Sequence, residues 1–284
     1  VLMRQGNKRI YMRKLIVSLS LVLSSSLALA VSPAESGVVL AENYAFQEFD
    51  NQYYIGIGTN YGNLTNSYAQ NTNYGTTFVG FGIERLFDMG LWARFDGSMM
   101  IGYSNYNSSN PNATTGPLGQ DPAIGDLNVK VGYAFPVLVD TLLVTPYVLV
   151  GRNTNLTSNS LNNNLSSSGG VNNLTANVTQ DYFLTGGLGG RVEYRINKVF
   201  DVYFDQNVLY NSDQSQPTAT YTSASNYQLT STLGAKFNVW DELQIGLQAF
   251  YTYNALTGSP TSAQQYQLYQ QNQIGTMATI GLTY

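Results

Sequence analysis

The sequence predicts an all-β fold, a closed antiparallel transmembrane β-barrel of ten strands, with eight or twelve strands as the alternatives. Apolar and polar residues alternate along ten segments of the length that a tilted strand needs to cross a bilayer. Charged residues make up 11% of the chain, whereas a soluble surface usually carries roughly 25–35%. The most apolar stretch after residue 30, residues 135–151, is interrupted by Pro136, Asp140 and Pro146, so it cannot form a spanning helix. A closed barrel remains, because it leaves no unpaired strand edge in hydrocarbon.

The first thirty residues are typical of a secretory signal peptide. Arg13 and Lys14 precede an apolar run, and residues 28–30 form a small-residue cleavage site, Ala-Leu-Ala. We therefore expect export and cleavage before Val31. Residues 1–11 are either an extension of the basic start or a misassigned start. Removal of residues 1–30 leaves 8 basic against 17 acidic residues, which argues against a nucleic-acid partner.

The rest of the chain divides into two segments. Residues 31–51 have no clear hydrophobic period, and we interpret them as a periplasmic N-terminal segment that is untethered rather than a partial plug. Residues 52–284 carry the alternating pattern and form the expected outer-membrane barrel. Within residues 91–103, for example, the odd positions are apolar or small, while Arg94 and Asp96 share the even positions. The predicted strands are residues 52–62, 74–87, 91–103, 125–137, 142–152, 181–196, 200–210, 227–239, 242–254 and 274–284.

The predicted connections alternate between short and long. The short ones are residues 88–90, 139–141, 197–199 and 240–241. The long ones are rich in Asn, Ser, Thr, Gly and Gln, and the longest, residues 153–180, is a low-complexity tract that we expect to be disordered. Short periplasmic turns and long extracellular loops are typical of an outer-membrane barrel.

Charged residues of both signs fall on the polar face of the strands, which we assign to the lumen because the apolar face must meet lipid. Hairpins centred on Met89 and Lys198 place oppositely charged residues face to face, close enough for ion pairs. The expected pairs are Glu84 with Arg94, Arg191 with Asp205, and Arg195 with Asp201. The complete expected lumen charge network is Glu84, Arg94, Asp96, Lys130, Arg191, Glu193, Arg195, Asp201, Asp205 and Lys236. Such a network either neutralises a narrow lumen or forms a charged constriction that selects small solutes.

The end of the chain carries a resemblance to a known group. Ile280, Leu282 and Tyr284 alternate with small residues and finish on an aromatic side chain. Together with the signal peptide and the asymmetric loops, this ending resembles the small bacterial outer-membrane β-barrel proteins, which include OmpA-type transmembrane domains and OmpW-like proteins. The resemblance implies a bacterial outer-membrane location, an assembly signal at these three residues, and contact with outer-membrane lipid, lipopolysaccharide and the barrel-assembly machinery.

Two functions fit this fold. The first is a narrow porin-like channel for small solutes, since ten strands leave at most a narrow path. The alternative is a structural or adhesive surface protein with a closed lumen, whose long loops contact host or cell-surface ligands. The chain has no Cys and no His, so we expect no enzymatic activity, no catalytic residues, no metal site and no cofactor. An aspartate-only mechanism at Asp96 or Asp205 is the one enzymatic alternative.

Overall fold

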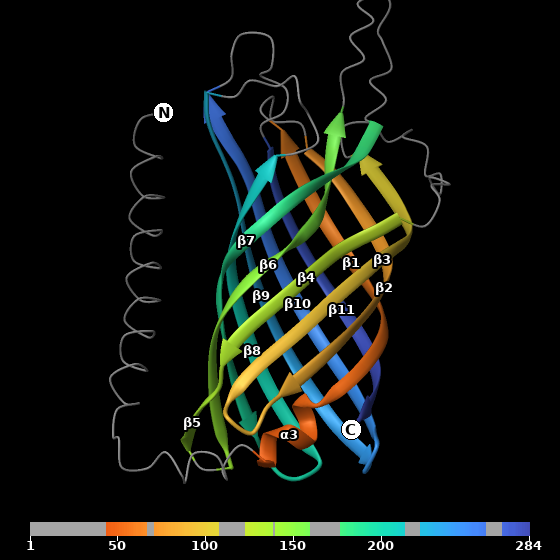
Figure 1. Ribbon diagram of the computed structural model, residues 1–284. Coiled ribbons are helices and arrows are strands. Elements are labelled where there is room, and N and C mark those ends of the chain that lie inside the picture. The colour runs from red at the N-terminus through yellow and green to blue at the C-terminus, as the bar shows by residue number, and fades with distance from the viewer. Residues whose placement is uncertain are drawn as a thin grey trace, which may run out of the picture.

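Ten strands wrap around the lumen, and a short helix lies at one mouth (Figure 1). The computed structural model describes residues 44–66, 71–107, 123–138, 140–159, 177–213, 222–259 and 269–284. The elements are α3 (Tyr44–Asp50), β1 (Gln52–Asn66), β2 (Asn71–Leu86), β3 (Leu91–Asn107), β4 (Ala123–Tyr133), β5 (Phe135–Leu138), β6 (Leu142–Asn159), β7 (Asn177–Arg195), β8 (Phe200–Asp213), β9 (Thr222–Trp240), β10 (Leu243–Ser259) and β11 (Tyr269–Thr283). Among these described residues, no helix is long and apolar enough to cross a membrane.

The sheet is closed and antiparallel, as the sequence predicts. Each strand pairs with its neighbours in the chain, and β1 pairs with β11 along their full length, from Gln52 opposite Thr283 to Asn66 opposite Tyr269. β4 and β5 are two parts of one wall strand, because both pair with β6 and only Ala134 separates them. The barrel therefore has ten wall strands, and the prediction of ten is confirmed.

The strands match the predicted ranges to within one residue at the turn mouth, apart from the break at Ala134, and continue further into the long connections. β6 extends to Asn159 and β7 begins at Asn177, with Asn159 opposite Asn177. The expectation that residues 153–180 are disordered is therefore wrong at both ends of that range, and residues 160–176 lie outside the described part. Hairpin pairing explains the extension: backbone hydrogen bonds continue across two polar segments without an apolar face.

The short turns lie at the same mouth as α3 and the C-terminus (Figure 1). Two of them contain a residue with a left-handed backbone conformation, Gly90 with φ of 85° and Asp140 with φ of 56°. Glycine adopts this conformation without strain, and aspartate tolerates it better than most residues. We call this end the turn mouth and the opposite end the loop mouth.

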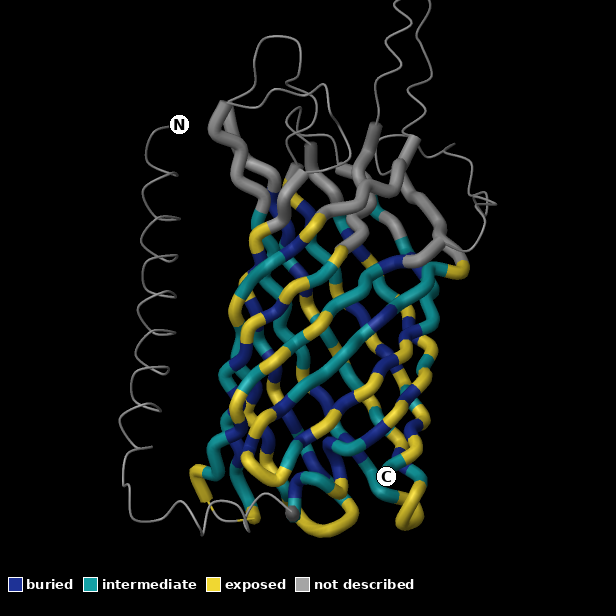
Figure 2. Tube along the Cα trace, in the orientation of Figure 1, coloured by how far each residue is buried: buried dark blue, intermediate teal, exposed yellow. Residues whose placement is uncertain are grey.

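Exposed residues alternate with buried ones along the wall of the barrel (Figure 2), and many of the exposed ones are large and apolar. Exposed large side chains occur on every side, for example Ile57 at 57%, Leu188 at 67%, Leu233 at 62% and Ile274 at 62%. A soluble monomer rarely exposes a contiguous apolar patch of more than a few hundred Å². The alternate residues of the same strands, charged and amide-bearing, are buried inside. The predicted assignment of the two faces is confirmed.

Helix α3 corrects the expectation for the N-terminal segment. Phe46 and Phe49 lie one turn apart and are completely buried, and Asp50 is buried beside them. A seven-residue helix is unstable in isolation, so these contacts with the barrel hold it in place. The preference for an untethered segment is wrong for residues 44–50, which occupy the turn mouth as a plug.

Candidate functional site: the barrel lumen

The wall of the barrel caps the C-terminal end of α3. The last carbonyl groups of a helix have no partner within the helix. Here the Lys236 ammonium donates to the Phe49 carbonyl at 3.2 Å, as does the Gln244 amide at 3.3 Å. The Asn238 amide donates to the Glu48 carbonyl at 3.2 Å. A cation at this position also complements the helix dipole, so β9 and β10 bind α3 through its backbone.

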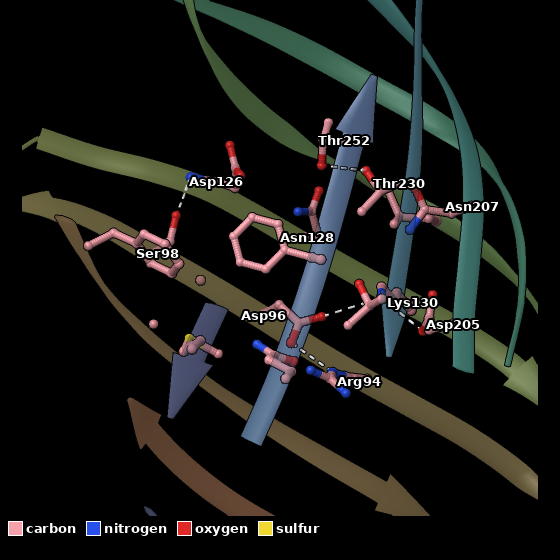
Figure 3. A pocket seen from close by; sticks show the side chains of 18 of the residues that line it. Arg94, Asp96, Ser98, Asp126, Asn128, Lys130, Asp205, Asn207, Thr230 and Thr252 are labelled. Carbon is pink, nitrogen blue, oxygen red and sulfur yellow. Dashed lines mark hydrogen bonds and ion pairs between the residues drawn. The ribbon is translucent and has the colours of Figure 1, made fainter. Parts of the chain in front are cut away.

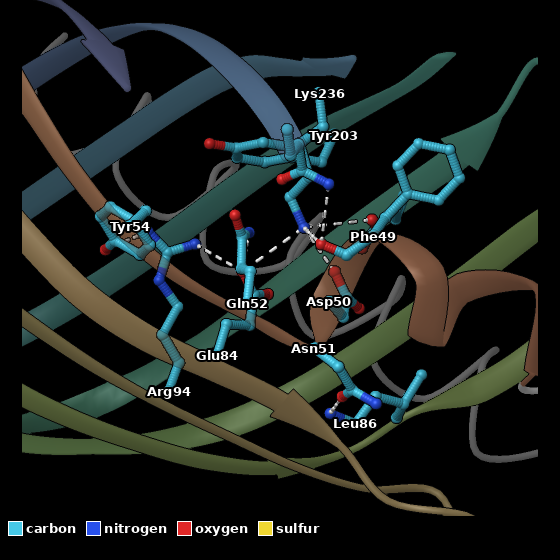
Figure 4. Close-up of polar contacts among 12 residues, drawn as sticks. Phe49, Asp50, Asn51, Gln52, Tyr54, Glu84, Leu86, Arg94, Tyr203 and Lys236 are labelled. Atoms are coloured by element: carbon cyan, nitrogen blue, oxygen red, sulfur yellow. Dashed lines mark hydrogen bonds and ion pairs between the residues drawn. The ribbon is translucent and has the colours of Figure 1, made fainter. Parts of the chain in front are cut away.

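A buried charge network joins α3 to three strands of the wall, β2, β7 and β9, and Figure 4 shows its members Asp50, Glu84 and Lys236. We define the lower network as Asp50, Glu84, Arg191, Glu193 and Lys236. The Asp50 carboxylate lies 2.5 Å from the Lys236 ammonium and 3.4 Å from the Arg191 guanidinium. The Glu193 carboxylate contacts the same two cations, at 2.9 Å from Arg191 and 3.6 Å from Lys236. All five side chains are at most 4% exposed.

Glu84 is the most connected member of the lower network. One oxygen accepts from the Trp92 indole at 3.0 Å and from Arg191. The other accepts from Gln52 at 3.2 Å and lies 3.4 Å from both Lys236 and Arg94. This carboxylate therefore compensates three cations from three strands, in surroundings where an unpaired charge is very costly.

The predicted cross-strand registers are confirmed, but two of the three expected ion pairs form elsewhere. Glu84 lies opposite Arg94 and their charged groups are 3.4 Å apart. Arg191 lies opposite Asp205 and Arg195 opposite Asp201. However, the Arg191 side chain pairs with Glu84 and Asp50 instead of Asp205, while Arg195 lies 3.4 Å from Glu48 on α3. A long arginine side chain can contact carboxylates on strands other than the adjacent one. The strand register alone therefore does not determine its ion-pair partner.

Asp201 lies at the turn mouth without a cation. It is completely buried, and within the described residues no basic group comes within ion-pair distance of it.

A cavity of about 240 Å³ lies between the lower network and the loop mouth (Figure 3). We call this cavity the upper cup. Its floor holds Arg94, Asp96, Lys130 and Asp205. The Arg94 guanidinium lies 2.7 Å from Asp96, and the Lys130 ammonium lies 3.8 Å from Asp96 and 3.4 Å from Asp205. Two cations thus alternate with two carboxylates. The side chain of Asp96 is 22% exposed and that of Lys130 is 12% exposed.

Tyrosines lie flat against glycines of the neighbouring strand and bring their hydroxyl groups into the lumen. Tyr147 lies opposite Gly189, and Tyr203 lies opposite Gly234. A Cβ atom added at either glycine would lie 2.3 Å or 2.2 Å from the Cζ atom of the facing ring. The Tyr147 hydroxyl donates to Asp205 at 2.5 Å. The lumen glycines therefore accommodate aromatic rings as well as leaving room.

Sequence reasoning missed several members of the lumen. Asp50 precedes the first strand by two residues and carries no periodic signal. The tyrosines Tyr54, Tyr147 and Tyr203 sit on the polar face by parity. For Tyr203 the signal was its parity, which it shares with Asp201 and Asp205, since a tyrosine there brings a hydroxyl group to charged residues. The strands of Tyr54 and Tyr147 carry no charged residue on that parity.

The three residues of the expected assembly signal lie at the end of the chain, where β11 pairs with β1. Ile280, Leu282 and Tyr284 are 52%, 60% and 51% exposed on the outer surface. The Tyr284 amide donates to the Asn51 carbonyl at 3.1 Å, and its ring packs on Tyr53 with centroids 4.7 Å apart. β11 closes the barrel against β1, as predicted.

The described residues contain no group of three or more His, Cys, Asp or Glu side chains arranged to hold a metal ion.

A closed antiparallel barrel with an apolar exterior and a charged lumen defines the class of outer-membrane β-barrel proteins. No protein-family model matches the chain, and no curated protein sequence does. Among solved structures, it is similar to the outer-membrane protease OmpT of Escherichia coli, with 8% identity, 83% of this chain and 98% of that chain covered, and a TM-score of 0.41.

Two further similar structures are an autotransporter unit and another outer-membrane protein. The transport unit of the autotransporter AIDA-I from Escherichia coli shows 11% identity, coverage of 88% and 98%, and a TM-score of 0.42. The outer membrane protein OprG from Pseudomonas aeruginosa shows 10% identity, coverage of 84% and 98%, and a TM-score of 0.32. These values are too low to assign a family or a function.

Proposed function

We propose that the protein is a non-enzymatic, narrow outer-membrane channel for small polar solutes, and that α3 closes it at the turn mouth. The observation that carries this proposal is the upper cup, a polar cavity of about 240 Å³ on the loop side of the lower network. A barrel that serves only as a scaffold has no need of such a cavity, because side chains can fill an interior of eight to ten strands.

The path below the cup is narrow. A second cavity of about 20 Å³ lies between the cup and α3, against β9, β10 and β11, with Gln52, Gln244 and Gln248 among its lining residues. That volume is enough for a water molecule and little more. Beyond it, Phe49 and Asp50 block the turn mouth. Passage of a solute therefore requires displacement of α3 and rearrangement of the lower network.

The remaining expectations belong to this proposal. Residues 1–30 would act as a cleaved signal peptide for export. The bilayer facing the outer surface would be the bacterial outer membrane with its lipopolysaccharide, and the assembly machinery would recognise Ile280, Leu282 and Tyr284. We also propose that the protein belongs to the group of OmpA-type and OmpW-like proteins.

Conductance in planar bilayers tests the channel. We expect the refolded full-length chain to give small, infrequent openings. A Phe49→Ala/Asp50→Asn variant should give longer and larger openings, because it loses a buried ring and the two ion pairs of Asp50 that hold α3. Asp241→Asn, which removes a carboxylate from an exposed turn, is the control and should behave as the parent chain. Heat-modifiable gel mobility confirms folding of each variant.

The second candidate is a structural or adhesive surface protein, with host or cell-surface ligands bound by its long loops. The closed turn mouth and the buried lower network favour it. It predicts silence in the bilayer for both the parent chain and the Phe49→Ala/Asp50→Asn variant, and that outcome would reject the channel.

A further inference from the structure

We propose that the upper cup binds a small neutral polyhydroxylated solute of about monosaccharide size. This inference names the substrate class of the proposed channel, and for passage through the barrel it rests on that proposed function. Three features of the cup support it: the compensation of the charges on its floor, the chemistry of its polar walls, and an aromatic patch.

The four charged groups on the floor of the cup compensate one another, and a fifth charged residue, Asp126, also lines the cup. Asp96 lies 2.7 Å from Arg94 and 3.8 Å from Lys130, and Lys130 lies 3.4 Å from Asp205. The Tyr147 hydroxyl further satisfies Asp205. An anionic or cationic solute would have to break one of these pairs to gain a partner, while its own charge lost hydration. The floor therefore favours a solute without net charge.

The walls above the floor carry amides and hydroxyl groups (Figure 3). Asn128, Asn207 and Gln248 contribute side-chain amides, and Thr230 and Thr252 contribute hydroxyl groups. An amide offers a donor and an acceptor side by side, and a hydroxyl group does the same from one atom. Adjacent hydroxyl groups of a polyol need this mixed set, whereas a simple ion needs only one kind of partner.

An aromatic patch interrupts the polar wall. Phe78 and Phe250 both line the cup, and their rings pack edge to face with centroids 6.0 Å apart. They lie over lumen glycines, because a Cβ atom at Gly58 or Gly275 would lie 2.4 Å or 2.3 Å from the facing Cζ atom. The C–H face of a sugar ring is apolar and packs against aromatic rings, while its hydroxyl groups point sideways to polar partners.

The volume sets the size of the solute. About 240 Å³ is below the range of roughly 300–1,000 Å³ that accommodates drug-sized ligands. A single sugar ring is compatible with this space. An oligosaccharide would extend out of the cup.

Calorimetric titration of the refolded full-length protein with three related sugars tests the inference. D-Glucose, cationic D-glucosamine and anionic D-glucuronate share one ring and differ in charge. We expect D-glucose to bind, and each charged analogue to bind at least about tenfold more weakly because of the cost of desolvating its charge. Equal binding of all three, tighter binding of a charged analogue, or no binding of D-glucose would overturn the proposal.

Substitution of the aromatic patch provides the second arm. Phe78→Ala/Phe250→Ala should weaken D-glucose binding by about tenfold, the scale of two lost aromatic contacts. Phe250→Leu retains apolar volume without the ring and should still weaken binding, even if the double variant fails to fold. Phe204→Ala removes a ring from the outer surface, where Phe204 is 43% exposed, and should leave binding unchanged. Unchanged affinity in folded Phe250→Leu protein would contradict the role of the patch.

The experiments distinguish failure of the glucose-binding proposal from failure of the channel proposal. Glucose binding without conductance in any α3 variant would reject the channel and retain the site. Conductance without glucose binding would retain the channel and reject the site.

Discussion

The two parts of the lumen use the same residue types in different surroundings. In the lower network the Glu84 side chain is completely buried and that of Arg191 is 1% exposed, whereas in the upper cup the Asp96 side chain is 22% exposed and that of Lys130 is 12% exposed. The difference arises from α3, which covers the lower groups and adds the Asp50 carboxylate. The same alternation of cations and carboxylates therefore serves as a closure in one part and as the floor of a cavity in the other.

The largest expected difference between the two parts concerns stability. Glu84→Gln should lower the free energy of unfolding by about 3–5 kcal/mol, because it leaves buried cations without their shared carboxylate. Asp96→Asn in the upper cup should cost clearly less, since water reaches that group. Urea unfolding in lipid vesicles measures both losses. Equal losses would contradict the distinction between a dry and a wet part of the lumen.

An intermediate effect is expected where a tyrosine of the lumen rests on a glycine. Gly189→Ala should cost about 1–3 kcal/mol, because the new Cβ atom would displace the Tyr147 ring from its place beside Asp205. Gly190→Ala is the matched control, since a Cβ atom there would meet nothing within 4 Å. The same unfolding measurement applies, and a similar loss in both variants would exclude a role for the ring contact.

The smallest effect is expected on the wall of the upper cup. The Thr230 and Thr252 hydroxyl groups are 3.3 Å apart, and Thr252→Val removes this hydrogen bond from a site that water can reach. The cost should be under about 1 kcal/mol. Thr276→Val on the exposed outer surface serves as the reference. A loss above about 2 kcal/mol for Thr252→Val would mean that the cup wall is as dry as the lower network.

Strand period and hairpin symmetry made the fold predictable from the sequence. A strand that buries one face and exposes the other to lipid must alternate, so parity assigned Arg94 and Asp96 to the lumen. The centres of the tight turns then fixed the registers of Glu84 with Arg94 and of Arg191 with Asp205. Both arguments use only residues that are close together in the sequence. Once each strand pairs with its neighbour in a closed antiparallel sheet, few other arrangements of the strands remain.

The organisation of the lumen was not predictable in this way. Arg191 contacts Glu84, from which it is separated by 107 residues, and Lys236 contacts Asp50, from which it is separated by 186. Such contacts depend on the curvature of the closed wall and on side-chain length, and a two-strand register contains neither. Helix α3 was not predictable for a related reason. Its two phenylalanines lie only one turn apart, and a single turn does not show a helical period in the sequence.

The docking of α3 has a consequence for the order of folding. Its partners are spread around the wall: Asp88 lies in the turn after β2, and Arg191, Lys236 and Gln244 lie on β7, β9 and β10. These groups converge only when the first and last strands have met, and contacts of such long sequence separation form late. Helix α3 therefore has no complete binding site on an open sheet. Insertion of α3 at the turn mouth therefore indicates that the barrel has closed.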